Sequence, residues 1–186
     1  MPRCTVVGWP EHDDFEGWVS LLASPHRASQ AYWHLVLSPI ALPIVREGLK
    51  SSNAEVRRHC ARVLDHLADE ASFEQLLDVL GDPDPQVRGE VLHAIACDRC
   101  KGEVCTPEKE QVLPRAIDLL REDSDKYVRS MAAEVVGKWA HEDNTASDAL
   151  AAARDLDPEP SVRKKAGWFA PGGTIYRKTA PKVGRI

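Results

Sequence analysis

The sequence lacks any apolar run close to the about 18 residues that a membrane-spanning helix needs. Its first residues also lack the apolar stretch of about 7–15 residues that marks a secretory signal peptide. Cysteine is scarce, and five cysteines at uneven spacing do not suggest a disulfide framework. These absences argue against membrane-spanning and disulfide-stapled secreted proteins. For the same reasons we expect the protein to be located in the cytoplasm. Because the chain has 186 residues, we expect one domain.

Acidic residues are absent from the segment 160–186. Seven of the 24 basic residues lie in this segment, whereas all 29 acidic residues precede it. An acidic body with a basic end has two interpretations. The end is either a solvated tail, or a contact arm for an acidic partner or for phosphates. Arg177 and Lys178 are candidate partner-binding residues on the second interpretation.

The clearest feature that is present is a Val-Arg pair that occurs four times. The pairs follow one another at 31, 41 and 34 residues, and periods of about 20–50 residues are typical of repeat architectures. Three residues before each valine stands Asn, Asp or Glu, and Asn and Asp are strong helix caps. Mostly small apolar residues follow each valine by four and seven positions, which predicts an amphipathic helix, here called a B helix. The pairs are Val56-Arg57, Val87-Arg88, Val128-Arg129 and Val162-Arg163.

A second helical pattern, here called an A helix, precedes each B helix. The segments between A and B read SSN, GDPD, EDSD and DPEP, which is the composition of turns and caps. The expected A helices span 41–51, 72–80, 108–121 and 146–155, and an atypical first pair spans 14–22 and 26–37. The pattern therefore predicts about five helical hairpins, at 14–38, 40–69, 72–97, 108–141 and 146–170. The segment 97–107 is an insertion, and the basic tail 171–186 is expected to be extended.

The pattern D-x-x-V-R-x-x-A-x-x-A-L, which closes each hairpin across residues 40–170, resembles that of HEAT repeats. It is particularly similar to the short HEAT-like repeats of the phycobilisome-lyase type, and the end of the chain resembles a family of small uncharacterised bacterial HEAT proteins. The resemblance implies a fold: an all-α, right-handed α-solenoid of HEAT-like hairpins. It implies little about function, because proteins of this kind include scaffolds, adaptors, lyase-related chaperones and DNA glycosylases.

The four repeated arginines have two interpretations. On successive parallel helices they could line a groove and bind phosphates. In proteins that resemble this one, however, such an arginine usually pairs with a turn carboxylate of the neighbouring unit, and we expect this structural ladder. The available carboxylates belong to Asp82, Asp84, Asp123, Asp125 and Asp157.

The insertion holds three of the five cysteines: Cys97, Cys100 and Cys105. Cys-x2-Cys spacing lets two thiolates reach one Zn²⁺, and a structural site needs four ligands. His93 lies one helical turn before Cys97 and is a candidate ligand, and His66 holds the position of Cys97 in the preceding B helix. Three hypotheses stay open: a structural zinc clip, reduced thiols, or a redox pair formed by Cys97 and Cys100.

Other chemistry-bearing residues divide into core and surface. Cys60 and Trp139 align with apolar positions of the repeat and are predicted to be buried. The position six residues after each valine is predicted to face solvent or a groove. It holds the candidate partner-binding residues Arg62, His93, Glu134 and Trp168.

No catalytic arrangement is visible beside this repeat. The first functional hypothesis is therefore a non-enzymatic scaffold or adaptor that binds a protein partner on its B-helix face, since helical repeats form extended binding surfaces. The second is a nucleic-acid module, of the DNA-glycosylase kind, that uses the repeated arginines, Trp168 and the basic end. The third is a thiol- or metal-responsive module built on Cys97, Cys100 and Cys105.

Overall fold

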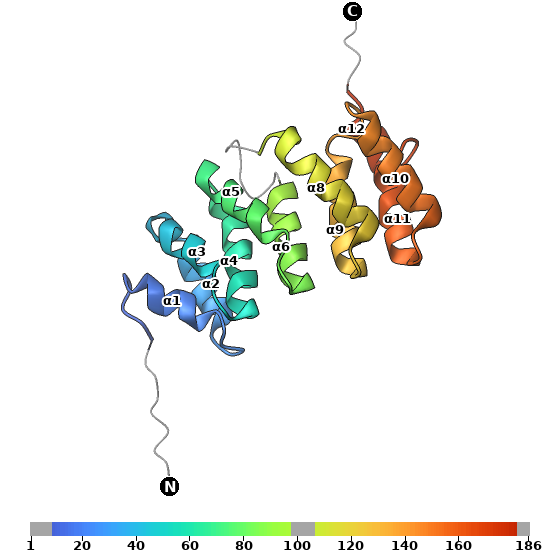
Figure 1. Cartoon of the computed structure of the whole chain (residues 1–186). Helices are drawn as coiled ribbons and strands as arrows, with labels where there is room; N and C mark the ends of the chain where they lie inside the picture. Colours follow the sequence, from blue (N-terminus) through green and yellow to red (C-terminus); the bar gives the residue numbers. More distant parts are fainter. Residues whose placement is uncertain (1–8, 98–106, 182–186) are drawn as a thin grey trace, which may run out of the picture.

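The computed structural model describes residues 9–97 and 107–181, and these residues fold into a row of α-helices (Figure 1). None of the described helices is both long and apolar enough to cross a bilayer. The helices are α1 (Phe15–Leu21), α2 (Ala28–Val36), α3 (Leu42–Gly48, preceded by the 3₁₀ turn Pro39–Ala41), α4 (Ala54–Leu67), α5 (Glu70–Val79), α6 (Pro85–Ala96), α8 (Lys109–Glu122), α9 (Lys126–Gly137), α10 (Asn144–Leu156), α11 (Pro160–Phe169) and α12 (Thr174–Thr179).

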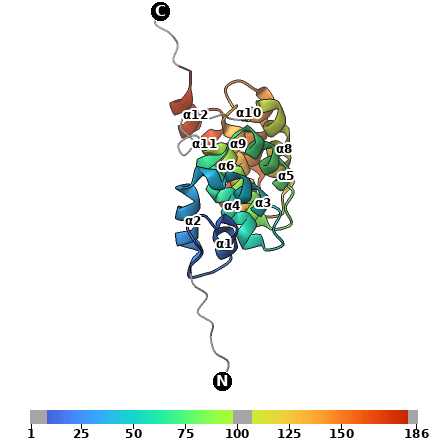
Figure 2. The same ribbon diagram turned by 90° about the vertical axis from the view of Figure 1, so that its left-hand side faces the viewer.

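The helices form two layers of a solenoid. The B helices α4, α6, α9 and α11 each pack against the next, and the A helices α3, α5, α8 and α10 each pack on the B helix of their own hairpin. Figure 2 looks along the row and shows α5, α8 and α10 on one side, with α2, α11 and α12 on the other. The helix α2 packs on α4 and so continues the B layer, while α1 packs on α2 and α3. The predicted α-solenoid of HEAT-like hairpins is confirmed.

The B helices begin where the caps predict. The side chains of Asn53, Asp84 and Asp125 each accept a hydrogen bond from a backbone amide in the first turn of the helix that follows. Glu159 stands at the same position before α11 but makes no such side-chain bond. Pro160 is the first residue of α11, where its fixed φ and missing N–H suit the start of a helix.

The core runs along the row between the two layers. The repeat positions four and seven residues after each valine are buried in α4, α6 and α9, and Cys60 is fully buried as predicted. Trp139 is only partly buried, because it follows the end of α9, and it packs against the edge of the core. Each B helix thus presents a small-residue stripe to its neighbours, which lets the helices approach closely.

The prediction of an extended basic tail is wrong for its first part. After α11 the chain reverses at Gly172, whose φ of 83° favours glycine. The chain then forms α12, which packs on α11. The ring of Tyr176 stacks on that of His141 at 3.9 Å between centroids, and Nε2 of His141 lies 2.9 Å from the carbonyl oxygen of Tyr176. A six-residue helix is not stable alone, so this packing holds it.

Candidate functional site

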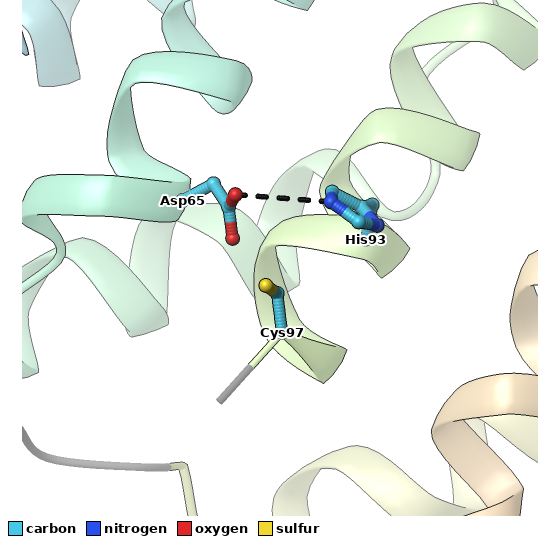
Figure 3. A group of neighbouring side chains, drawn as sticks. All are labelled: Asp65, His93 and Cys97. Atoms are coloured by element: carbon cyan, nitrogen blue, oxygen red, sulfur yellow. Dashed lines mark ion pairs between the residues drawn. The ribbon is translucent and has the colours of Figure 1, made fainter. Parts of the chain in front are cut away.

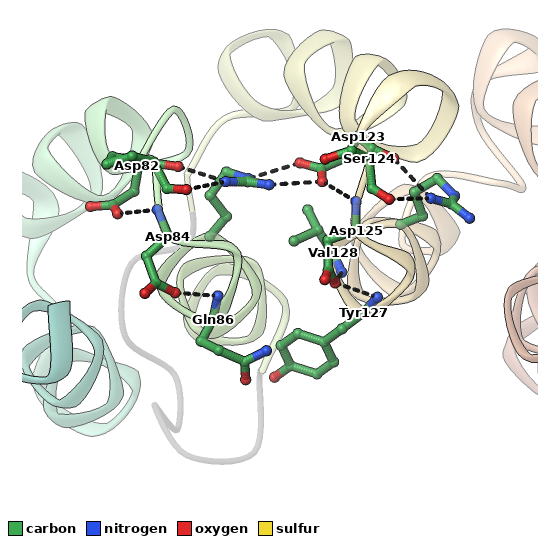
Figure 4. Close-up of polar contacts among 11 residues, drawn as sticks. Asp82, Asp84, Gln86, Asp123, Ser124, Asp125, Tyr127 and Val128 are labelled. Carbon is green, nitrogen blue, oxygen red and sulfur yellow. Dashed lines mark hydrogen bonds and ion pairs between the residues drawn. The ribbon is translucent and has the colours of Figure 1, made fainter.

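The repeated arginines form a ladder between hairpins. Arg88 on α6 donates from Nε and NH2 to the two carboxylate oxygens of Asp123, both at 2.8 Å, and from NH1 to the carbonyl oxygen of Asp82 at 2.7 Å. Figure 4 shows these turns and the contacts that join them. Arg57 binds Asp82 in the same way, and Arg129 binds Asp157. The predicted ladder is confirmed for these three arginines.

The two aspartates of the turns before α6 and α9 have different roles. The first, such as Asp82, receives the arginine of the preceding hairpin and also accepts from the amide of Asp84. The second, Asp84, caps the next helix by accepting from the amide of Gln86 (Figure 4). Burial opposes ionisation of Asp82, but the bonds from Arg57 and from the amide of Asp84 prevail and lower its pKa. The turn before α6 is therefore built around a charged carboxylate.

Because they form this ladder, the repeated arginines are not available to bind the phosphates of a nucleic acid. The guanidinium groups of Arg57, Arg88 and Arg129 are largely buried and already saturated by carboxylate and carbonyl oxygens. Arg163 in the last B helix donates instead to the carbonyl oxygens of Asp157 and Pro158. Of the groups named in the nucleic-acid hypothesis, Trp168 and the basic end of the chain remain.

The four candidate partner-binding positions lie on four adjacent B helices. Arg62 on α4 is exposed, His93 on α6 and Glu134 on α9 are half-buried, and Trp168 on α11 is 38% exposed. Glu134 accepts from Nζ of Lys165 at 2.6 Å, which links α9 to α11. The structure thus arranges these positions as one row across the B-helix layer. Arg177 and Lys178 lie beyond its end, exposed on α12.

Aromatic and basic groups meet at the α4 end of this row. The guanidinium carbon of Arg62 lies 4.8 Å from the ring centroid of Tyr32, and the hydroxyl of Tyr32 lies 2.7 Å from Nε2 of His66. Trp33, which is 53% exposed, has its ring 6.4 Å from that of His66. His66 therefore contacts α2, whereas Cys97 lies at the end of α6.

The α11 end of the row repeats this chemistry, and the middle is acidic. The ammonium groups of Lys164 and Lys165 lie 5.7 and 5.9 Å from the ring of Trp168, within cation–π range. Glu90 lies in the middle, on α6, where burial raises its pKa against the opposing charge of Arg62. The row therefore changes from basic and aromatic to acidic, and back again.

A cluster with metal-ligand chemistry lies on the same layer. One ligand atom each from Asp65 on α4, His93 on α6 and Cys97 at the end of α6 lie within 4.8 Å of one another (Figure 3). Nε2 of His93 is 3.7 Å from Oδ2 of Asp65. The sequence predicted His93 and Cys97 together but missed Asp65; the other predicted ligands, Cys100 and Cys105, lie outside the described residues.

Several hollows of the described surface lie along α8, mostly on the other layer. One of them, between α5 and α8, is lined by Glu74, Leu77, Asp78, Glu110, Gln111, Pro114 and Arg115. Arg115 donates to the carbonyl oxygen of Leu77 across it, at 2.8 Å. Another lies between α8 and the start of α10. These hollows arise between helices of different hairpins, so no local sequence pattern could have indicated them.

The architecture defines the class of protein: an α-solenoid of helical hairpins. Residues 42–113 match the family model of HEAT repeats, so this part of the chain consists of HEAT repeats. The family model is that of HEAT repeats in general, and the finer resemblance to the phycobilisome-lyase type stays a prediction. No curated protein matches the sequence.

Designed and engineered proteins are among the solved structures with a similar fold. One is a designed armadillo repeat protein in complex with the peptide (KR)4, at 18% identity and a TM-score of 0.53, over 82% of this chain and 78% of that one. Another is an engineered protein of the Northeast Structural Genomics Consortium, at 20% identity and a TM-score of 0.53, over 83% of this chain and 77% of that one. At such identities the likeness concerns the fold alone.

Proposed function

We propose that this protein is a non-enzymatic scaffold that binds an extended segment of a protein partner across its B-helix layer. The observation that carries the proposal is the row formed by Arg62, His93, Glu134 and Trp168. These side chains stand at one repeat position on four adjacent helices and remain accessible in whole or in part. Tryptophan and arginine are enriched among the residues that dominate binding at protein interfaces. The row supplies both.

The dimensions of the row suit a short extended segment. Packed helices lie about 8–10 Å apart, so three steps from α4 to α11 cover on the order of 25–30 Å. An extended chain advances about 3.3 Å per residue, and a segment of about eight residues would reach from Arg62 on α4 to Trp168 on α11. The designed armadillo protein of similar fold was solved with a peptide, which supports this mode of binding for the present chain.

The charges of the row indicate the chemistry of the partner. A matching segment carries a basic group at its centre, opposite Glu90, since Glu134 is already paired with Lys165. Toward its two ends it carries acidic or apolar groups, opposite Arg62 and the lysines beside Trp168. Complementary charge of this kind favours the correct register and a faster encounter more than it adds affinity.

Site-specific photocrosslinking in cells tests the proposal. A benzophenone amino acid at Ser130, one turn from Glu134 on α9, is expected to capture a partner at high yield. The same group at Gln111, exposed on α8, serves as the matched control on the A-helix side. Capture from position 111 and not from position 130 would contradict docking on the B-helix layer.

Two surface variants sharpen this experiment. Trp168→Ala is expected to reduce the crosslink at position 130 at least about tenfold, as loss of an aromatic side chain that dominates binding does. Leu156→Ala removes a side chain that is 79% exposed on α10, and it is expected to leave the crosslink unchanged. Equal loss in both variants would argue against a defined site.

A DNA-binding assay distinguishes the protein scaffold from the nucleic-acid module. If the chain instead binds nucleic acid through Trp168, Lys164 and α12, then affinity for duplex or single-stranded DNA falls steeply with salt concentration. Absence of binding at low salt removes that alternative. Salt-dependent binding that Trp168→Ala abolishes would favour it over the protein scaffold.

A further inference from the structure

We propose that Asp65, His93 and Cys97 form a zinc-binding site that joins the ends of two neighbouring repeats. The three side chains come from α4 and α6, which pack side by side, and their ligand atoms already lie within 4.8 Å of one another. In a tetrahedral zinc site, bonds of about 2.0–2.3 Å place ligand atoms about 3.3–3.8 Å apart. Small side-chain rotations are therefore sufficient to enclose an ion, without movement of either helix.

The position of Asp65 in the repeat supports a specific role. Asp65 is 4% exposed, and an ionised carboxylate is costly to bury unless it is paired with a charge or a metal. It stands nine residues after the valine of its B helix, where α6 has Ala96 and α9 has Gly137. Since a small residue fills this position in those two repeats, packing alone does not require an aspartate here.

Helix geometry directs the other two ligands to the same point. His93 and Cys97 are separated by four residues, so they lie on one face of α6, and the amide of Cys97 donates to the carbonyl oxygen of His93 at 2.9 Å. Cys97 is the C-cap of α6, at the point where the chain leaves the B layer. A metal bound here would fix that exit to α4 in the preceding hairpin.

The donor set selects the class of metal. One thiolate, one imidazole and one carboxylate suit Zn²⁺, whereas Mg²⁺ and Ca²⁺ prefer oxygen ligands alone. Both His93 and Cys97 are partly exposed, so an ion can enter and a fourth ligand can complete the tetrahedron. The sequence predicts Cys100 and Cys105 as further ligands; the site proposed here is built without them.

Metal titration of the full-length chain tests the site. Protein stripped of metal is titrated with Zn²⁺ in competition with a chromogenic chelator, and one ion per chain is expected. Asp65→Asn, His93→Gln and Cys97→Ser are each expected to weaken binding by at least about tenfold, the lower limit seen for loss of a single supporting partner. Cys60→Ser is the control, because burial raises the pKa of that thiol to about 12 and keeps it from ligating a metal.

Two further measurements distinguish this site from zinc binding by the cysteines of the insertion alone. Cobalt substitution is expected to give a thiolate charge-transfer band that is lost in Cys97→Ser and kept in the Cys100→Ser/Cys105→Ser variant, while circular dichroism verifies that each variant folds. Zinc at equal concentration is also expected to raise the melting temperature of the unmodified chain more than that of Asp65→Asn.

Two results would overturn the proposal. One is the absence of zinc binding. The other is binding that Asp65→Asn and His93→Gln leave intact but a Cys100→Ser/Cys105→Ser variant abolishes, because the site would then lie within the insertion. Both results leave the proposed docking of a partner segment untouched, because the crosslink at position 130 tests that docking separately.

Discussion

Arg129 and Asp157 are joined by two parallel hydrogen bonds between neighbouring hairpins, Nε to Oδ2 at 2.8 Å and NH2 to Oδ1 at 3.1 Å. Arg129 is 6% and Asp157 9% exposed, so this is a buried charge pair in an otherwise apolar seam. NH1 of Arg129 also donates to the carbonyl oxygen of Asp123 in its own turn. The guanidinium therefore fixes the turn of one hairpin against the turn of the next.

We expect Arg129→Ala to lower the free energy of unfolding by about 3–5 kcal/mol, because removal of one partner leaves the charge of Asp157 buried and uncompensated. Arg163→Ala is the matched control. Arg163 holds the same repeat position in the last B helix, but it donates only to carbonyl oxygens in its own turn. Its loss is expected to cost about 1 kcal/mol. Urea denaturation measures both, and equal costs would show that the bond between hairpins adds nothing.

The same pair predicts a dependence of stability on pH. Burial opposes ionisation of Asp157, but the bonds from Arg129 and from the amide of Glu159 prevail and lower its pKa below the usual 3.8. A lowered pKa in the folded state means that the stabilisation is fully present above the unfolded value and is lost as the pH falls through the folded value. We expect the stability difference between the unmodified chain and Asp157→Asn to be constant from pH 7 to pH 5 and to shrink below about pH 4.

Urea titrations of both proteins at pH 7, 5, 4 and 3 measure this difference. Other carboxylates with lowered pKa, such as Asp82, are present in both proteins and cancel in the comparison. A difference that stays constant down to pH 3, or that grows, would contradict the assignment of the acid sensitivity to this pair.

The ladder could be predicted from the sequence because its members recur. Asp82, Asp123 and Asp157 each stand five residues before the valine of a Val-Arg pair, so alignment of the repeats indicates both partners. Asp65 recurs nowhere, and its proximity to His93 depends on how α4 packs against α6. Contacts that recur from repeat to repeat could therefore be predicted from the sequence. A contact that occurs at a single interface between two helices could not.

The helix α12 was missed for a related reason. Pro171, Gly172 and Gly173 correctly indicate the end of α11, and the residues after them have no strong apolar pattern. The six residues of α12 are helical because they pack on α11 and on His141, which is a tertiary effect that local propensity does not contain.

Gly137 offers a test of the close approach of α9 and α11. A Cβ at this position would lie 2.7 Å from Cγ and 2.9 Å from Cβ of Phe169. Because Cβ of Phe169 is attached to its own helix, the ring cannot simply turn away. We expect Gly137→Ala to lower the free energy of unfolding by about 1–3 kcal/mol, the range for overpacking.

Gly81→Ala is the control. A Cβ at this position would have no atom within 4 Å, and the substitution is expected to change stability by about 0.5 kcal/mol or less. Equal effects of the two substitutions, measured by urea denaturation, would mean that α9 and α11 can separate at low cost.

The docking of α12 is expected to depend on Tyr176. Its ring stacks on His141, so Tyr176→Ala removes the main aromatic contact between α12 and the turn after α9. We expect the amides of residues 174–179 to lose their protection from hydrogen exchange, because a helix this short does not persist without packing. The amides of α9 and α11 are expected to keep their protection, since these helices belong to the core of the row.

Lys178→Ala, on the exposed side of α12, is the control and is expected to leave the protection of α12 unchanged. Persistent protection in Tyr176→Ala would show that contacts with α11 alone hold α12 in place.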